Sequence, residues 1–268
     1  MRTKFVEFCE ARAAADPDFV LITADLGYGI FDKFRANCGS QFINIGVAEQ
    51  NLIGVATGDA LTGGKPLCYS LANFPTFRCL EQIRNDAAYH EAQVTIVASG
   101  GGFAYGQLGM SHHATEDLGV LRCLPNVEIF APSTPTEAEM LMPYIFDRPS
   151  VKYVRLEKTG ANAIHINDNP LASGYFKYSD GADALILAVG GILEEALEAR
   201  SMLLRDGIDA TVVSFACFKS REPFHQQALT DLLLRFDRVL TMEEHNVVGG
   251  LGTVVTSALG KLKEPKHL

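Results

Sequence analysis

The sequence lacks an apolar run of about 18 residues, and that absence argues against a membrane-spanning helix. It also lacks a basic run, and its net charge of −9 at pH 7 argues against a nucleic-acid-binding surface. Residues 1–17 fit an amphipathic helix rather than a signal peptide, because acidic residues interrupt the apolar ones. We therefore expect a cytoplasmic protein that binds neither membrane nor nucleic acid.

The sequence has no C-x-x-C pair. Its six cysteines are scattered along the chain, in a spacing that fits neither a zinc site nor a disulfide scaffold. We expect small buried thiols in a reducing compartment. These cysteines are Cys9, Cys38, Cys68, Cys79, Cys123 and Cys217.

The 268 residues alternate short β-branched runs with helical stretches, which is typical of parallel sheets covered by helices. We predict an α/β fold with two domains, each a mainly parallel sheet flanked by helices. The first domain covers residues 1–160, a linker covers 161–182, and a second, possibly truncated domain covers 183–268. Strands are expected at 19–24, 41–44, 66–70, 94–99, 127–130, 151–155, 184–189, 210–214 and 238–242, and the main helices at 49–61, 76–90, 135–145, 193–205, 224–236 and 252–262.

Glu49 stands where a predicted strand gives way to a helix, and apolar residues surround it in the sequence. A carboxylate among apolar neighbours is costly to ionise, so the site favours the protonated form, which can donate a hydrogen bond. The simpler alternative is a first-turn glutamate that the helix dipole stabilises. The spacing alone leaves both interpretations open.

The segment IGVAEQN at residues 45–51 resembles the cofactor-activating motif of thiamine diphosphate enzymes, specifically of the transketolase family. The resemblance continues in order along nearly the whole chain. It implies a pyrimidine-binding domain, a transketolase C-terminal domain and thiamine diphosphate as cofactor. The further segments are NFPTFRCLEQIRND at 73–86, GGGFAYG at 100–106, SHHATEDLGVLRCLPN at 111–126, RLEKTG at 155–160 and EEHNVVGGLG at 243–252.

The resemblance assigns roles to several side chains. Glu49 matches the activating glutamate, while Phe74 and Phe77 match aromatic residues that hold the pyrimidine ring, where offset stacking suits a flat heterocycle. Both phenylalanines could instead be ordinary core residues. His112 matches a histidine near the substrate that donates to its oxygens or moves a proton. It could instead only cap the following helix.

Two arginines are further candidates for binding substrate. Arg155 resembles a family arginine near the phosphate end of sugar substrates, and a guanidinium suits phosphate well. A surface salt bridge is the alternative. Arg78 is a similar candidate with a weaker match. The glycines at 100–102 predict an active-site wall rather than a nucleotide site, although a plain flexible loop fits the same residues.

One departure from the family concerns the substrate. Leu108 stands where typical transketolases carry an acidic residue for a sugar hydroxyl, and a family histidine just upstream is replaced within residues 100–102. An apolar wall cannot satisfy the hydroxyl groups of a sugar. The sequence therefore predicts a less polar or unusual acceptor.

A second departure concerns the cofactor's diphosphate. The family motif that begins G-D-G and binds diphosphate and metal is absent, because Gly58-Asp59-Ala60 lies within a predicted helix. We therefore predict no metal ligands on this chain. A partner chain, the N-terminal transketolase subunit, would carry the diphosphate and Mg²⁺ site. We expect two copies of each chain across a large, mostly apolar interface.

The leading hypothesis is thus the C-terminal subunit of a two-component transketolase, which moves a two-carbon ketol unit from a ketose-type donor to an aldehyde-type acceptor. Two related alternatives are 1-deoxyxylulose-5-phosphate synthase and the β subunit of the decarboxylating component of a 2-oxoacid dehydrogenase. A hypothesis of another class is a non-catalytic assembly subunit. A plain Rossmann-like binding protein has no supporting fingerprint.

Overall fold

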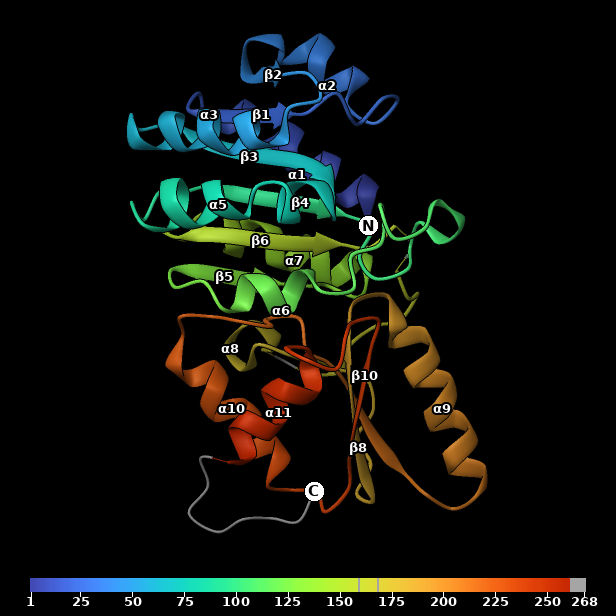
Figure 1. Ribbon diagram of the computed structural model, residues 1–268. Helices are drawn as coiled ribbons and strands as arrows, with labels where there is room; N and C mark the ends of the chain where they lie inside the picture. Colours follow the sequence, from blue (N-terminus) through green and yellow to red (C-terminus); the bar gives the residue numbers. More distant parts are fainter. Residues whose placement is uncertain (159, 168, 261–268) are drawn as a thin grey trace.

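The computed structural model describes residues 1–158, 160–167 and 169–260, which form two sheets with helices on their faces (Figure 1). The first sheet has six parallel strands in the order β2-β1-β3-β4-β6-β5. Its strands are β1 (Phe19–Thr23), β2 (Phe42–Asn44), β3 (Lys65–Leu71), β4 (Thr95–Ser99), β5 (Val127–Phe130) and β6 (Val151–Leu156).

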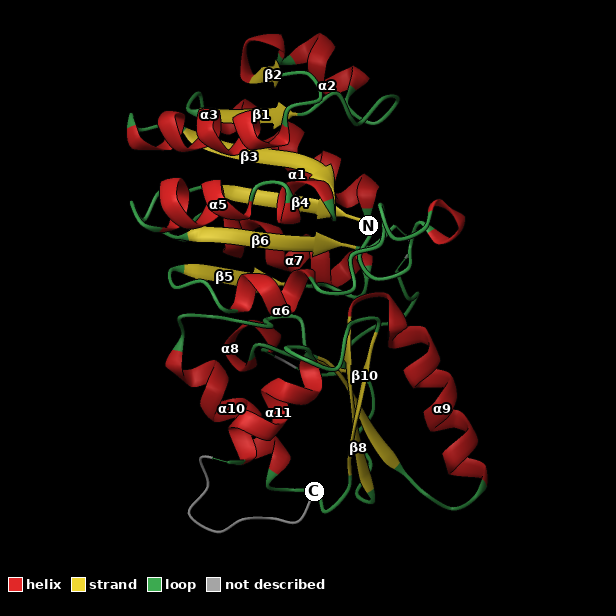
Figure 2. Ribbon diagram, in the orientation of Figure 1, coloured by secondary structure: helices red, strands yellow, loops and turns green. Residues whose placement is uncertain are grey.

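Helices cover both faces of this sheet (Figure 2), as its strands' apolar side chains require. On one face, α1 (Arg2–Ala15) and α7 (Pro135–Phe146) pack over a core that includes Phe5, Phe19 and Phe146. On the other face, α3 (Glu49–Leu61) and α6 (Asp117–Arg122) cover a second core. The short helix α2 (Asp32–Asn37) and the 3₁₀ turn η1 (Gly39–Gln41) lie beyond β1, near the sheet edge.

The second sheet has the order β10-β8-β9-β7, in which β7 alone pairs antiparallel. Helix α9 packs on one face, and α10 and α11 cover the other (Figure 1). Its elements are α8 (Pro170–Ser173), β7 (Phe176–Lys177), β8 (Ala184–Val189), η4 (Gly190–Ile192), α9 (Leu193–Arg205), β9 (Ala210–Ser214), α10 (Pro223–Leu233), β10 (Val239–Glu243) and α11 (Leu251–Leu259).

The predicted α/β fold with two mainly parallel sheets is confirmed, and most strands lie within two residues of their predicted bounds. The domain limits stay a prediction, although β7 falls inside the proposed linker and pairs with the second sheet. The last predicted helix ends at Leu259, and its expected final residue, Leu262, lies outside the described residues.

The single helix predicted at 76–90 is wrong. The segment forms α4 (Phe74–Phe77), α5 (Leu80–Gln82) and a π-helical turn, η2 (Ile83–Ala88). Pro75 suits the first turn of α4, where its missing N–H is not needed. Cys79 then leaves the helical region, with φ −111° and ψ 9°, and so separates α4 from α5.

The thiols are free, but only four of the six are buried, so the expectation of buried cysteines is wrong for exposed Cys123 and partly wrong for Cys38.

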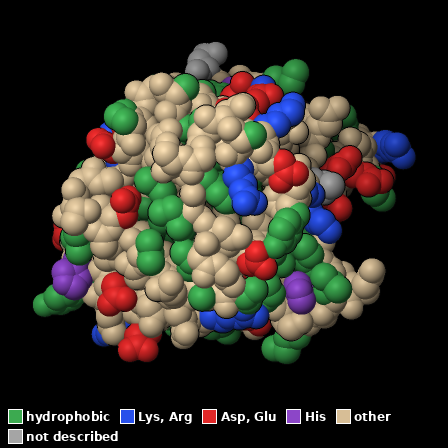
Figure 3. Space-filling view, turned by 90° about the horizontal axis from the view of Figure 1, so that it is seen from above, with side chains coloured by type: hydrophobic (Ala, Val, Ile, Leu, Met, Phe, Trp, Pro, Cys, Tyr) green, Lys and Arg blue, Asp and Glu red, His purple; other side chains and the backbone are tan. Residues whose placement is uncertain are grey.

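Within the described part of the chain, no helix is long and apolar enough to cross a membrane. On the face seen from above, acidic and basic side chains are interspersed with apolar ones (Figure 3).

A buried carboxyl group joins the two domains. Glu137, on α7, accepts hydrogen bonds from the Tyr178 hydroxyl (2.5 Å) and the Ser214 hydroxyl (3.0 Å) of the second domain. It also accepts from the backbone N–H of Ser133 at 2.7 Å. Burial raises the pKa of Glu137 to about 7, and these three donors only partly offset that rise.

This pKa predicts a dependence of stability on pH. Because the folded state raises the pKa of Glu137 from 4.5 to about 7, its contribution is complete below pH 4.5 and is lost as pH rises through 7. We expect a loss of roughly 3 kcal/mol in the free energy of unfolding across this window. Glu137→Gln, which stays neutral, should remove that loss.

Urea unfolding at pH 5, 6, 7 and 8 measures this difference. Glu198→Gln, at an exposed position on α9, makes the same chemical change and should keep the wild-type slope. Equal slopes for wild type and Glu137→Gln would contradict the prediction.

Candidate active site

A turn after β2 positions Glu49. The Asn44 side chain accepts hydrogen bonds from the N–H groups of Asp25 (2.9 Å) and Gly46 (3.0 Å). Gly46 has φ +75°, which glycine adopts without the strain that a side chain would cause. The chain then enters α3 with Glu49 as its first residue. The sequence thus fixes this carboxylate at the carboxyl edge of the first sheet, where ligands of such sheets bind.

The Glu49 residue is only 4% exposed, and its Oε2 accepts a hydrogen bond from Arg78 Nη1 at 3.0 Å. The Arg78 guanidinium also lies over the Phe74 ring, 3.9 Å from its centroid. The predicted burial of Glu49 is therefore confirmed. A purely apolar setting is not, because Arg78, at α4's C-cap position, places a cation beside the carboxyl group.

His112 reaches the same group of side chains from the loop after β4. Its ring lies edge-on to Phe74, with centroids 5.2 Å apart, and its Nδ1 is 2.9 Å from the Ser111 hydroxyl. A bridge between Gly102 and Ala114 closes this loop. Contacts therefore connect Glu49, Arg78, Phe74 and His112 in one continuous row.

The neighbours of His112 were not predicted. The Asn73 side chain donates to the His113 carbonyl at 2.9 Å, which holds the loop against α4. The Tyr105 ring lies 6.0 Å from the His112 ring. Asn73 and Tyr105 both lie in segments that resemble the transketolase family. Nothing in the spacing of these residues, however, indicates that they contact the loop of His112.

Phe77 ends α4 with 37% of its surface exposed, so an ordinary core role does not describe it. Its ring makes no ring–ring contact with another described aromatic residue. It lies four residues after Asn73, on the helix that carries Phe74. Its role in holding a pyrimidine ring stays a prediction.

Arg155 does not face open space. It is fully buried, and Glu157 Oε1 (3.0 Å) and Asp117 Oδ1 (3.3 Å) pair with its Nε and Nη1. Burial alone would lower the pKa of Arg155, but these two carboxylates raise it further above its ordinary value. The surface salt bridge considered from the sequence is thus a buried one, and the substrate-binding role of Arg155 stays a prediction.

The glycine-rich loop has a packing reason. A Cβ at Gly101 would collide with the Arg155 side chain, and one at Gly100, where φ is +81°, would collide with the Tyr105 ring. These contacts account for the glycines, and the active-site wall stays a prediction. Gly101 lets the backbone pass close to the buried Arg155 guanidinium, and Gly100 lets it pass close to the Tyr105 ring.

Arg155→Ala should lower the free energy of unfolding by about 3–5 kcal/mol, because it leaves Asp117 and Glu157 buried without their cation. Urea unfolding at pH 7 measures the loss. Arg205→Ala, at an exposed position in the last turn of α9, should change stability by less than about 0.5 kcal/mol. A loss below about 1 kcal/mol for Arg155→Ala would show that the buried ion pairs are dispensable.

Two family models match the chain. The transketolase pyrimidine-binding domain matches residues 1–162, and the transketolase C-terminal domain matches residues 175–267. An apulose-4-phosphate transketolase subunit from Phocaeicola vulgatus is 32% identical over 100% of this chain and 86% of its own length. A putative transketolase C-terminal section from Methanocaldococcus jannaschii is 33% identical over 90% of this chain and 76% of its own length.

A solved structure agrees with these sequences. It is a split-gene transketolase described as an inactive β4 tetramer, which is 31% identical and superposes with a TM-score of 0.85. The superposition covers 98% of this chain and 85% of that one. The chain therefore belongs to the transketolase family, as a subunit of the split type that carries the pyrimidine-binding and C-terminal domains.

Proposed function

We propose that this chain provides the activating carboxylate and part of the substrate wall of a thiamine diphosphate-dependent transketolase. The enzyme transfers a two-carbon ketol unit from a ketose-type donor to an aldehyde-type acceptor, in the cytoplasm. The observation that carries this proposal is the buried Glu49 carboxylate beside Arg78, Phe74 and His112 at the carboxyl edge of the first sheet.

These residues suit thiamine diphosphate. Among the described residues, Arg78 alone donates a hydrogen bond to the Glu49 carboxylate, and it donates to Oε2, so Oε1 can hydrogen-bond the aminopyrimidine. Phe74 and Phe77 offer aromatic surface for the ring, since Phe77 is partly exposed. Bound there, the cofactor would supply its carbanion chemistry, and Glu49, Phe74 and Phe77 would orient its ring. No cluster of three potential metal ligands occurs in the described ranges, and we propose that the partner holds Mg²⁺.

His112 and Glu49 have separate tasks in this proposal. Glu49 holds or gives up a proton at the aminopyrimidine, which is why its burial matters. His112 donates to the substrate's oxygens or moves a proton there, and Ser111 and Phe74 fix the orientation of its ring. Arg78 would steady the Glu49 carboxylate and present its remaining donors to an anionic part of the substrate.

The partner subunit would cover the carboxyl edge of the first sheet. Exposed apolar side chains gather in the loops after its strands, where water would otherwise cover them. We propose that the N-terminal transketolase subunit docks here, with two copies of each chain in the complex. The inactivity of the related β4 tetramer supports the need for a second kind of chain. The exposed side chains are Tyr28, Val47, Phe77, Phe103, Leu108 and Met110.

Glu49→Gln should reduce kcat of the assembled enzyme by at least about 10³-fold while leaving assembly and folding intact, because an amide cannot exchange the proton that the carboxyl group handles. The measurement uses this chain co-purified with an N-terminal transketolase subunit, with a ketose phosphate as donor. Glu198→Gln, on α9, is the matched control and should retain wild-type kcat.

The same assay separates the alternatives. Unchanged activity in Glu49→Gln would indicate a non-catalytic assembly subunit. Turnover with pyruvate but not with a ketose donor would instead favour 1-deoxyxylulose-5-phosphate synthase or 2-oxoacid dehydrogenase chemistry.

Leu108 lies in the η3 turn (Gly106–Leu108) and is 51% exposed, so its side chain is available to a substrate. Leu108→Asp should raise kcat/KM for a polyhydroxylated aldehyde about tenfold relative to an aldehyde without further hydroxyls, since a carboxylate accepts hydrogen bonds that leucine cannot. Competition kinetics between the two aldehydes measures the ratio. Leu108→Asn is the uncharged comparison, and an unchanged ratio in Leu108→Asp would remove Leu108 from acceptor selection.

A further inference from the structure

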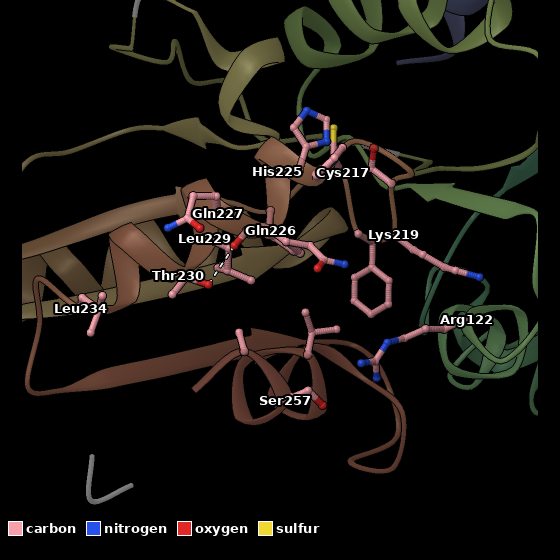
Figure 4. A pocket seen from close by; sticks show the side chains of 16 residues that line it. Arg122, Cys217, Lys219, His225, Gln226, Gln227, Leu229, Thr230, Leu234 and Ser257 are labelled. Atoms are coloured by element: carbon pink, nitrogen blue, oxygen red, sulfur yellow. Dashed lines mark hydrogen bonds between the residues drawn. The ribbon is translucent and has the colours of Figure 1, made fainter. Parts of the chain in front are cut away.

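A cavity lies between the first domain and the helices of the second, and Glu49 does not line it (Figure 4). It has a volume of about 510 Å³, within the roughly 300–1,000 Å³ that is typical of small-molecule sites. Its walls come from α10, α11, the segment after β9 and the end of α6. None of Glu49, Phe74, Phe77, Arg78 or His112 lines it, so the proposed transketolase chemistry does not account for it.

Most of the cavity wall is apolar. The apolar side chains form a continuous surface between α10 and α11, and several belong to the larger hydrophobic core. An apolar body that lies against these side chains would lose its contact with water, which favours binding. These side chains are Phe215, Phe218, Pro223, Leu229, Val254 and Ala258.

The charged groups of the cavity are cations. Arg122 and Lys219 line it, and no described aspartate or glutamate does, although the whole chain has 32 acidic residues and a net charge of −9. Burial lowers the pKa of Lys219, and the nearby Arg122 lowers it further, while Cys123 and Glu128, which do not line the cavity, act in the opposite direction. An anion would relieve this repulsion.

Arg122 is the cation that remains available. Lys219 Nζ already donates to the Leu124 carbonyl, whereas the side chain of Arg122 has neither a hydrogen bond nor an ion pair with any residue in the described ranges. In Figure 4 the Gln226 side chain extends from α10 towards the side of the cavity on which the Arg122 guanidinium lies. The exposed Gln226 side chain likewise has no hydrogen-bond partner among the described residues, so both groups can bind a ligand at the edge of the cavity.

His225 has a third unpaired group. It lines the cavity, is 3% exposed, and its Nε2 donates to the Leu171 carbonyl at 2.8 Å. Its Nδ1 is buried and has no partner within the described residues. Buried polar atoms without a partner are uncommon in folded proteins and point to a missing water or ligand group.

We propose that this cavity binds a small organic carboxylate with an apolar body. The Arg122 guanidinium, which can hold both oxygens of a carboxylate through two parallel N–H groups, receives the head group, and Gln226 donates a further hydrogen bond. The apolar body lies against Phe218, Leu229 and Val254. A phosphate dianion suits the cavity less well, because only one cation is free to neutralise it.

The test uses 4-phenylbutyrate and its neutral amide as probes, titrated calorimetrically into the full-length chain. Wild type should bind the carboxylate with a Kd of about 0.1–1 mM, as expected for a ligand of this size. It should bind the amide at least about tenfold more weakly. Arg122→Gln should lose this preference, so that carboxylate and amide bind alike.

Two further variants make the result specific. Ser257→Phe, which places a ring at the mouth of the cavity, should abolish saturable binding of both probes, and Arg205→Gln, on α9, should match wild type. Thermal unfolding of each variant checks that the fold is kept. No saturable binding to wild type, equal binding of acid and amide, or a preference that persists in Arg122→Gln would each overturn the proposal.

Because the readout is binding to this chain alone, the result does not depend on the transketolase assay. Normal binding of 4-phenylbutyrate by a chain that shows no transketolase activity would refute the proposed function alone. Transketolase activity without binding of 4-phenylbutyrate would refute the cavity proposal alone.

Discussion

The buried guanidinium of Arg155 is the constraint on which the arrangement of this chain depends. A cation with no exposed surface needs its charge compensated within the protein, and Asp117 and Glu157 provide that compensation from α6 and from the end of β6. The backbone must also come close to it, and Gly101 from the first domain and Gly190 from the second both do so. One side chain therefore fixes the start of α6, the loop that leads to His112 and the first turn after β8.

The site at Glu49 is held together by contacts between neighbouring side chains. A turn and the start of α3 position its carboxyl group, and Arg78, at the end of α4, donates a hydrogen bond to it. Phe74 and His112 then extend the site towards solvent through ring contacts. Rigid strands carry the whole group, which is how parallel sheets bring residues far apart in sequence to one edge.

Much of this could be predicted from the sequence. The alternation of strands and helices predicts both sheets, and the motif around Glu49 predicts the start of α3. The pairing of Arg155 with Glu157 follows strand periodicity, since residues two apart share a face, but Asp117 is 38 residues away and no pattern indicates it. The break at Cys79 and the hydrogen bonds of Glu137 to Tyr178 and Ser214 are likewise not indicated by local propensity.

The apolar side chains around the first sheet's carboxyl edge have a cellular consequence on the proposed function. Val47 and Met110 are 73% and 83% exposed in the lone chain. Subunits synthesised in excess would therefore expose apolar surface to which chaperones and proteases bind. Synthesis of the two subunits in equal amounts would then be favoured independently of the enzyme's activity. Because the active centre would lie between the two subunits, dilution would dissociate it. Specific activity should therefore fall as the protein concentration is lowered.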